Sequence, residues 1–136
     1  ICVAALGGEP GVHSARYAQS GAAGRETASR EMQDERNNAK LLAALEDCAD
    51  RRAHYYCVIV MMERPDDPQP LIAEGRWHGE VTAQRRGANG FGYDPYFFLP
   101  ELNCTAAELE PVAKNRISHR GQALRRLVAR LDVRHE

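Results

Sequence analysis

Two short segments of the sequence hold the side chains best suited to chemistry. The first is Phe91-Gly92-Tyr93-Asp94-Pro95, and the second, residues 114–121, contains Lys114, His119 and Arg120. Together they supply an aromatic face, a carboxylate, an ammonium, an imidazole and a guanidinium. These groups can hold a purine ring and the charged groups attached to it. The two segments therefore indicate nucleotide recognition.

The second segment places its donors at the start of a helix. Apolar residues recur at helical spacing after it and predict a last helix from Ser118 or His119 to Leu131. The unpaired N–H groups of a helix N-terminus attract oxygen lone pairs and negative charge. With His119 and Arg120 added, this terminus suits a purine 6-oxo group as well as a phosphate. The 6-amino group of adenine is a donor and would be left unpaired, at a cost of about 1–3 kcal/mol.

The first segment admits two interpretations. Phe91 lies within the glycine-rich stretch of residues 87–92 and could stack on a base, which is worth roughly 1–3 kcal/mol, while Asp94 could accept from ring N–H groups or the ribose. Alternatively, Phe91 and Tyr93 are core aromatics and Asp94-Pro95 initiates a turn. Lys114 is one of two lysines in an arginine-rich chain. A lysine at this position therefore indicates a role that requires a compact ammonium group. Taken alone, Lys114 is explained more simply as an exposed side chain.

Composition bounds the class of protein. The chain of 136 residues fits a single domain, residues 1–136, and its 43% hydrophobic and 27% charged residues are typical of soluble globular proteins. Its longest apolar run, residues 55–62, is too short to cross a bilayer, so no membrane partner is expected. The formal net charge of −1 argues against a domain devoted to nucleic acid. The basic stretch at residues 114–136 keeps nucleic-acid binding open as a less favoured alternative.

The cysteines indicate a reducing environment. None of the four has C-x-x-C spacing, and no H-E-x-x-H motif accompanies the five histidines, so no zinc site is expected. Three of the four cysteines lie in apolar or helical stretches typical of buried free thiols. We therefore expect a cytoplasmic protein.

The N-terminal half predicts two strands and a helix. Residues 1–6 are apolar and predict a strand that ends in a glycine-rich turn at residues 7–11. A helix is predicted over residues 27–50 from its late apolar stripe. Residues 54–63 are almost all apolar and partly β-branched, which predicts a strand covered on both faces at the centre of the sheet.

The C-terminal half predicts shorter elements. Residues 71–86 favour a hairpin or a bent pair of strands interrupted at residues 75–79, with Trp77 as a packing residue. A short strand is expected at residues 96–99. The sequence of residues 105–108 is a capping box that predicts the start of a short helix.

Five motifs, taken in order, carry a resemblance to a known family. They are Gly8-Glu9-Pro10-Gly11-Val12-His13-Ser14-Ala15-Arg16-Tyr17, Asn38-Ala39-Lys40-Leu41-Leu42, Gly90-Phe91-Gly92-Tyr93-Asp94-Pro95, Thr105-Ala106-Ala107-Glu108-Leu109, and Lys114 with Ile117-Ser118-His119-Arg120-Gly121. Over essentially its whole length, the chain resembles the non-canonical purine nucleoside triphosphate pyrophosphatases, also called inosine/xanthosine triphosphate or dITP/XTP pyrophosphatases.

The resemblance implies a fold and a reaction. The fold would be α/β, with an elongated mixed β-sheet flanked by helices and two lobes around a central cleft, usually as a homodimer. The reaction would be Mg²⁺-dependent hydrolysis of ITP, dITP or XTP to the monophosphate and pyrophosphate. By motif, Phe91, Gly92, Tyr93 and Asp94 would line the base and sugar pocket, and Lys114, His119 and Arg120 would contact the substrate, the last two at the 6-oxo group.

The sequence also departs from the family pattern. Family members begin with a Ser/Thr-x-Asn-x-x-Lys phosphate loop, acidic Mg²⁺ ligands and an Asp-Asp-Ser-Gly motif, and this chain has none of them. The resemblance therefore covers the C-terminal two-thirds of the fold and assigns no catalytic residue and no metal ligand here. Two hypotheses follow: a pyrophosphatase whose N-terminal third lies outside this sequence, or an inactive module that binds purine nucleotides without cleaving them. Little or no turnover is expected from this chain alone.

Overall fold

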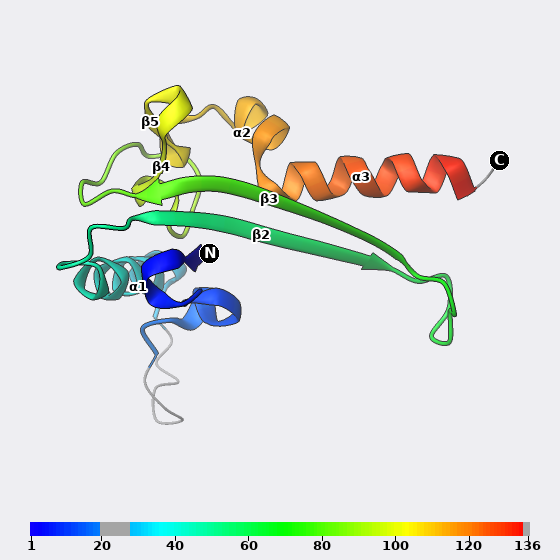
Figure 1. The fold of residues 1–136 in the computed structure, drawn as a ribbon, viewed down its shortest axis with the longest axis horizontal. Coiled ribbons are helices and arrows are strands. Elements are labelled where there is room, and N and C mark those ends of the chain that lie inside the picture. Colours follow the sequence, from blue (N-terminus) through cyan, green and yellow to red (C-terminus); the bar gives the residue numbers. More distant parts are fainter. Residues whose placement is uncertain (20–27, 135–136) are drawn as a thin grey trace. The chain divides into compact units, whose positions relative to one another are not determined.

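The computed structural model describes residues 1–19 and 28–134 (Figure 1). A five-stranded sheet has the order β1-β2-β3-β4-β5, and the pairs β1–β2, β3–β4 and β4–β5 are antiparallel. The strands are β1 (Cys2–Val3), β2 (Arg52–Met61), β3 (Leu71–Val81), β4 (Phe97–Leu99) and β5 (Cys104–Thr105); the α-helices are α1 (Arg30–Ala44), α2 (Pro111–Ile117) and α3 (His119–Arg134). This combination confirms the α/β fold class.

The chain divides into two compact units. Unit 1 comprises Ile1–His54 and His78–Pro111, and unit 2 comprises Tyr55–Trp77 and Val112–Glu136. Strands β2 and β3 contribute residues to both units. The single domain expected over residues 1–136 stays a prediction.

Helix α1 of unit 1 is shorter than the predicted helix over residues 27–50. It begins at Arg30 because the hydroxyl of Ser29 accepts a hydrogen bond from the N–H group of Met32 at 3.3 Å, which satisfies one donor of the first turn. It ends at Ala44, where the N–H group of Leu45 also reaches Leu42 O at 3.1 Å and tightens the last turn. Residue 27 lies outside the described residues.

The first strand is also shorter than predicted. Over residues 1–6, only Cys2–Val3 pair as β1, and Ala4–Leu6 form a 3₁₀ turn. The turn is followed by Gly7 and Gly8, both at positive φ, 63° and 97°. L-residues rarely adopt this conformation, so these glycines reverse the chain before a strand of six residues can form.

Strand β2 is not covered on both faces, and it lies second in the sheet, so β3 is the central strand. In unit 2, alternate residues of β2 are exposed: Tyr56 by 42%, Val58 by 51% and Val60 by 54%. An apolar run alone does not reveal how many faces of a strand are covered, because the covering comes from packed elements elsewhere in the sequence.

The hairpin predicted for residues 71–86 is wrong, because β3 runs unbroken through Gly75 and Gly79. A Cβ atom on Gly75 would lie 2.0 Å from His119 O and 2.9 Å from Ala123 N. The glycine therefore permits the close approach of the α3 backbone within unit 2. It does not mark a turn.

In unit 2, helix α3 runs alongside β3 (Figure 1). Its side chains form hydrogen bonds with one edge of that strand. Carbonyl groups of every second strand residue point to the same edge, and side chains spaced four residues apart on α3 donate to three of them. The bonds are Gln122 Nε2 to Arg76 O at 2.7 Å, Arg126 Nη1 to Glu74 O at 2.6 Å, and Arg130 Nη1 to Ile72 O. Four helical residues rise about 6 Å and two strand residues about 6.7 Å, so the two repeats nearly match.

Three other sequence predictions are confirmed by the fold. Trp77 is 6% exposed and packs in unit 2, and β4 lies within the strand expected at residues 96–99. Thr105 and Glu108 form both bonds of a capping box, which starts a 3₁₀ helix at Ala106–Glu108. The four cysteines are free but only half-buried, so the burial expected for three of them is wrong. No helix of the described residues is both long and apolar enough to cross a membrane.

The close approach at Gly75 predicts the effect of a single methyl group. Gly75→Ala should lower the free energy of unfolding by about 3 kcal/mol, because the new Cβ meets backbone atoms of α3 that cannot rotate away. Gly7→Ala is the matched control, since its Cβ would contact nothing within 4 Å and only its φ of 63° is strained, at about 1 kcal/mol. Urea denaturation of both variants measures the difference, and equal losses would contradict the packing argument.

Candidate functional site

The structure places the predicted site residues in two groups. Phe91, Gly92, Tyr93 and Asp94 lie together in unit 1, and Lys114, His119 and Arg120 lie together in unit 2. That the two groups serve one nucleotide stays a prediction.

Within unit 1, Phe91 differs from its neighbours in burial. Its side chain is 49% exposed, whereas Tyr93 is 5% and Asp94 is 4% exposed. The core interpretation therefore holds for Tyr93 but not for Phe91. Asp94 does initiate a turn, the 3₁₀ helix Asp94–Tyr96. The half-exposed ring presents an aromatic surface of the kind on which bases stack.

The Asp94 carboxylate holds the backbone of this turn. Its Oδ2 accepts a hydrogen bond from the N–H group of Phe91 at 3.0 Å, and the N–H group of Asp94 donates to Phe91 O at 3.2 Å. These reciprocal bonds fix the backbone from which the Phe91 ring projects. A contact between Asp94 and a base or ribose stays a prediction.

Helix α1 holds the next residue, Gly92, by both of its peptide groups. The N–H group donates to Asp34 Oδ2 at 2.8 Å, and the carbonyl oxygen accepts from Asn38 Nδ2 at 2.9 Å. Gly92 has a φ of 61°, which only glycine adopts without strain. The guanidinium of Arg30 lies 4.8 Å from the centroid of the Phe91 ring.

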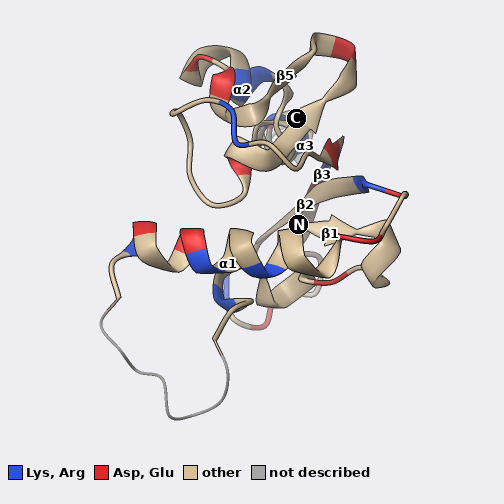
Figure 2. Ribbon diagram, turned by 90° about the vertical axis from the view of Figure 1, so that its left-hand side faces the viewer, with Lys and Arg blue, Asp and Glu red and all other residues tan. Residues whose placement is uncertain are grey.

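The role of α1 was not predicted from the sequence. Arg30, Asp34 and Asn38 are spaced four residues apart, so they share one face of the helix. This spacing was the available signal. Acidic and basic residues are interleaved along α1 (Figure 2), and such a pattern usually marks a solvated face.

A second amide of α1 holds the segment that precedes the helix. Asn37, which is 2% exposed, accepts from the N–H group of Ala18 at 2.8 Å and donates to Ala15 O at 3.1 Å. The Tyr93 hydroxyl donates to Ser14 O at 2.7 Å. Burial raises the pKa of the Tyr93 hydroxyl well above its usual range. One helix therefore organises two irregular segments of unit 1.

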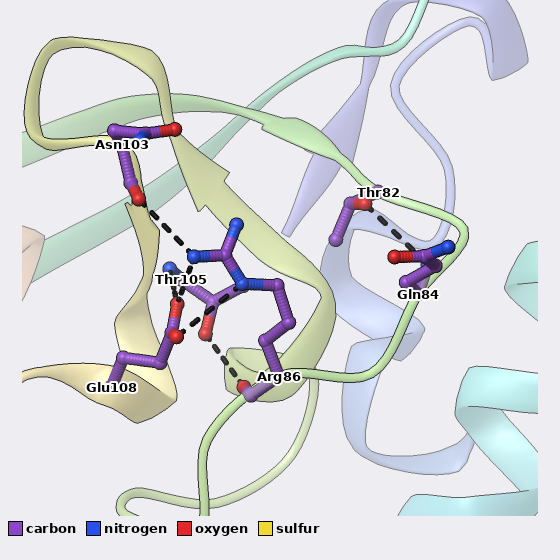
Figure 3. A network of polar contacts seen from close by, with 6 residues as sticks. All are labelled: Thr82, Gln84, Arg86, Asn103, Thr105 and Glu108. Atoms are coloured by element: carbon purple, nitrogen blue, oxygen red, sulfur yellow. Dashed lines mark hydrogen bonds and ion pairs between the residues drawn. The ribbon is translucent and has the colours of Figure 1, made fainter.

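The start of the glycine-rich stretch is held by the residues around β5 (Figure 3). The guanidinium of Arg86 pairs with the Glu108 carboxylate at 3.2 Å and donates to Asn103 O at 3.2 Å. The hydroxyl of Thr105 donates to Arg86 O at 2.6 Å. These contacts connect the capping box to the beginning of the stretch.

Close backbone packing continues into this stretch. Gly87 has a φ of 87°, and a Cβ atom there would lie 2.4 Å from the carbonyl carbon of Ala107. Asn89 donates its backbone N–H to Ala107 O at 2.9 Å and its side-chain amide to Leu109 O at 3.1 Å. The stretch is thus anchored before Phe91 as well as after it.

In unit 2, aromatic rings orient the imidazole of His119. The ring stacks on Tyr55 with centroids 4.7 Å apart and an interplanar angle of 11°, and it lies 6.3 Å from the Trp77 centroid. Helix α3 begins at His119, one of the two predicted starts, and Ser118 caps it, because its Oγ accepts from the N–H group of Gly121 at 3.2 Å. The adjacent Arg120 side chain is exposed.

The junction between α2 and α3 sets the position of Lys114 relative to α3. A Cβ atom on Gly121 would lie 1.8 Å from Asn115 O, so the two helices meet at this glycine. Lys114 O accepts from the N–H group of Ser118 at 2.8 Å, and Arg125 Nη2 donates to Arg116 O at 2.6 Å. The backbone positions of Lys114, His119 and Arg120 are therefore fixed relative to one another.

A metal site requires several ligating side chains close together. Within residues 1–19 and 28–134, no group of three or more His, Cys, Asp or Glu side chains could hold a metal ion. The described residues do not fit a magnesium site of their own.

Comparison with known proteins assigns the family, since residues 1–130 match the Ham1 family. The chain belongs to the Ham1 family. It is 59% identical over 131 residues to a dITP/XTP pyrophosphatase of Burkholderia pseudomallei, covering 96% of this chain and 60% of the relative. With one of Nitrosomonas europaea it shares 57% identity over 132 residues, covering 97% and 60%. The family assignment confirms the resemblance read from the motifs.

Solved structures agree with this assignment. A HAM1 protein from Coxiella burnetii has a TM-score of 0.85 and 48% identity, covering 96% of this Ham1 family chain and 62% of that chain. The Staphylococcus aureus Ham1 protein has a TM-score of 0.84 and 42% identity, covering 98% and 63%. The chain spans about 60% of the length of the two curated relatives named above.

The buried Tyr93 hydroxyl predicts a specific pH dependence. Its folded pKa lies above the ordinary value of 10, so its stabilisation is fully present below pH 10 and is lost as the pH rises further, when only the unfolded chain ionises. Tyr93→Phe should cost about 1 kcal/mol at pH 7 and flatten the decline above pH 10. Urea denaturation from pH 7 to 11 measures this, with Tyr96→Phe as the control. Parallel curves for wild type and Tyr93→Phe would refute it.

Proposed function

We propose that this Ham1 family chain recognises ITP, dITP and XTP for hydrolysis to the monophosphate and pyrophosphate. The observation that carries the proposal is the exposed ring of Phe91 on a turn whose backbone is fixed by Asp94 and by α1. The relatives named dITP/XTP pyrophosphatase support the substrate class.

The two groups of residues have distinct roles in this proposal. Phe91 stacks on the purine, and Gly92, Tyr93 and Asp94 form the wall from which it projects. In unit 2, His119 and Arg120 donate to the 6-oxo group, and Lys114 supplies a cation. Stacking does not distinguish bases, so discrimination against adenine depends on the donors of unit 2.

Further properties are part of the proposal. They are a requirement for Mg²⁺, a homodimer and a cytoplasmic location, and the family resemblance is their support. A magnesium ion would neutralise charge on the triphosphate during hydrolysis. Because the described residues do not form a metal site, we assign no step to the ion.

One experiment separates a pyrophosphatase from an inactive binding module. The purified chain is incubated with Mg²⁺ and ITP, dATP or dGTP, pyrophosphate release is measured, and binding is measured by calorimetry. Release from ITP alone would support hydrolysis by this chain. Binding of ITP without release would identify a binding module, and the absence of both would refute the proposed function for this chain.

Arg120 tests recognition of the 6-oxo group. Arg120→Ala should weaken ITP binding at least tenfold, because a hydrogen bond to a charged donor is worth about 1.5–3 kcal/mol, and it should affect ATP binding much less. Arg116→Ala, which removes another exposed arginine of the same unit, is the matched control. Calorimetric titration with both nucleotides measures the effect, and equal losses for ITP and ATP would contradict the assignment.

Phe91 tests stacking. Phe91→Ala should weaken the binding of ITP and ATP by a similar factor of about 5 to 150, since every base presents a π face. Phe91→Trp should retain affinity because it keeps an aromatic face. The same titrations measure these effects, and full affinity in Phe91→Ala would remove Phe91 from the site.

A further inference from the structure

Gly92 is the point at which side chains of helix α1 hold the Phe91 turn. Its N–H group and its carbonyl oxygen both bond to side chains of α1, at 2.8 Å and 2.9 Å. The two partners, Asp34 and Asn38, are 58 and 54 residues away in the sequence. Such long-range bonds fix the turn relative to a helix and not merely relative to itself.

The burial of Asn38 makes its bond costly to lose. The residue is 4% exposed, and its Oδ1 atom finds no donor among the described residues. The bond from Nδ2 to Gly92 O gives the NH₂ group of this buried amide a partner, and burying that group without a partner is strongly unfavourable.

The bond to Asp34 complements the bond inside the turn. The N–H groups of Phe91 and Gly92 are consecutive, and each donates to a carboxylate, Asp94 at 3.0 Å and Asp34 at 2.8 Å. A Cβ atom on Gly92 would contact nothing within 4 Å. Glycine is therefore required at this position for its positive φ and not for close packing where a side chain would lie.

We infer that Asp34 and Asn38 are positioning residues of the base site. By fixing both peptide groups of Gly92, they set the direction in which the ring of Phe91 projects. This inference rests on the proposed function. Neither residue contacts the base in this scheme, and each acts through Gly92.

The test compares variants of Asp34 and Asn38 with a neighbouring control. Asp34→Ala removes the acceptor, Asp34→Asn keeps an acceptor oxygen, and Asn38→Ala removes the donor. The control is Glu35→Gln, because Glu35 is exposed on the same helix. Circular dichroism identifies any variant that fails to fold, and the other alanine variant then carries the test.

Amide exchange by NMR and ITP titration provide two independent readouts. Asp34→Ala should speed exchange of the Gly92 amide at least tenfold, and both alanine variants should weaken ITP binding about tenfold, or about 1.4 kcal/mol at 25 °C. Asp34→Asn and Glu35→Gln should stay near wild type. Unchanged exchange, or faster exchange with unchanged ITP affinity, would overturn the positioning role.

A wild-type chain that binds no ITP would refute the proposed function and leave the positioning role to be decided without ligand. The proton shifts of the Phe91 ring then decide it. The role holds if Asp34→Ala and Asn38→Ala move these shifts and Glu35→Gln does not, and it fails if all three spectra match wild type.

Discussion

The Phe91 turn depends on hydrogen bonds that its own backbone cannot supply. Residues 91–93 belong to neither a helix nor a strand, and buried peptide groups outside such elements need other partners. Asp94 supplies one partner from within the turn, and α1 supplies two more to Gly92. Because these partners are side chains, the turn can hold a conformation that a sheet would forbid. It presents an exposed aromatic ring on a rigid backbone.

The same requirement shapes unit 2 by a different route. The edge of β3 presents carbonyl groups at every second residue, and α3 meets them with Gln122, Arg126 and Arg130. The approach is possible because Gly75 has no side chain. The arginines of α3 that a composition analysis assigns to solvent, or to nucleic acid, therefore include two that satisfy the sheet. This accounts for part of the positive charge near the C-terminus without any nucleic-acid partner.

Sequence analysis found the features whose causes are local. The capping box of Thr105 and Glu108 and the start of α3 after Ser118 depend on bonds across three residues, so a short motif is sufficient to predict them. The clamp on Gly92 joins residues 58 positions apart, and the four-residue spacing around Asp34 indicates a shared helix face but no partner so distant in the sequence. The sequence around Gly75 predicts an interrupted strand. The real reason for the glycine is hidden from local analysis, because the helix for which it makes room lies more than forty residues later in the chain. The prediction that β2 is covered on both faces is wrong for a related reason, since the burial of a strand depends on packing partners that its own sequence does not encode.

Exposed contact groups on a fixed backbone favour tight recognition of a ligand. The groups proposed to contact the base, the Phe91 ring and the Arg120 guanidinium, are exposed, while the atoms that hold their backbones are buried or bonded. Ordering a loop or a long side chain on binding costs affinity, so a backbone fixed beforehand lets more of the stacking energy appear as binding. The same holds for the side chain of His119, because stacking on Tyr55 holds its imidazole ring in place before any ligand binds. Specificity for a 6-oxo purine would then come in part from this rigid donor, which cannot turn away to accommodate the amino group of adenine.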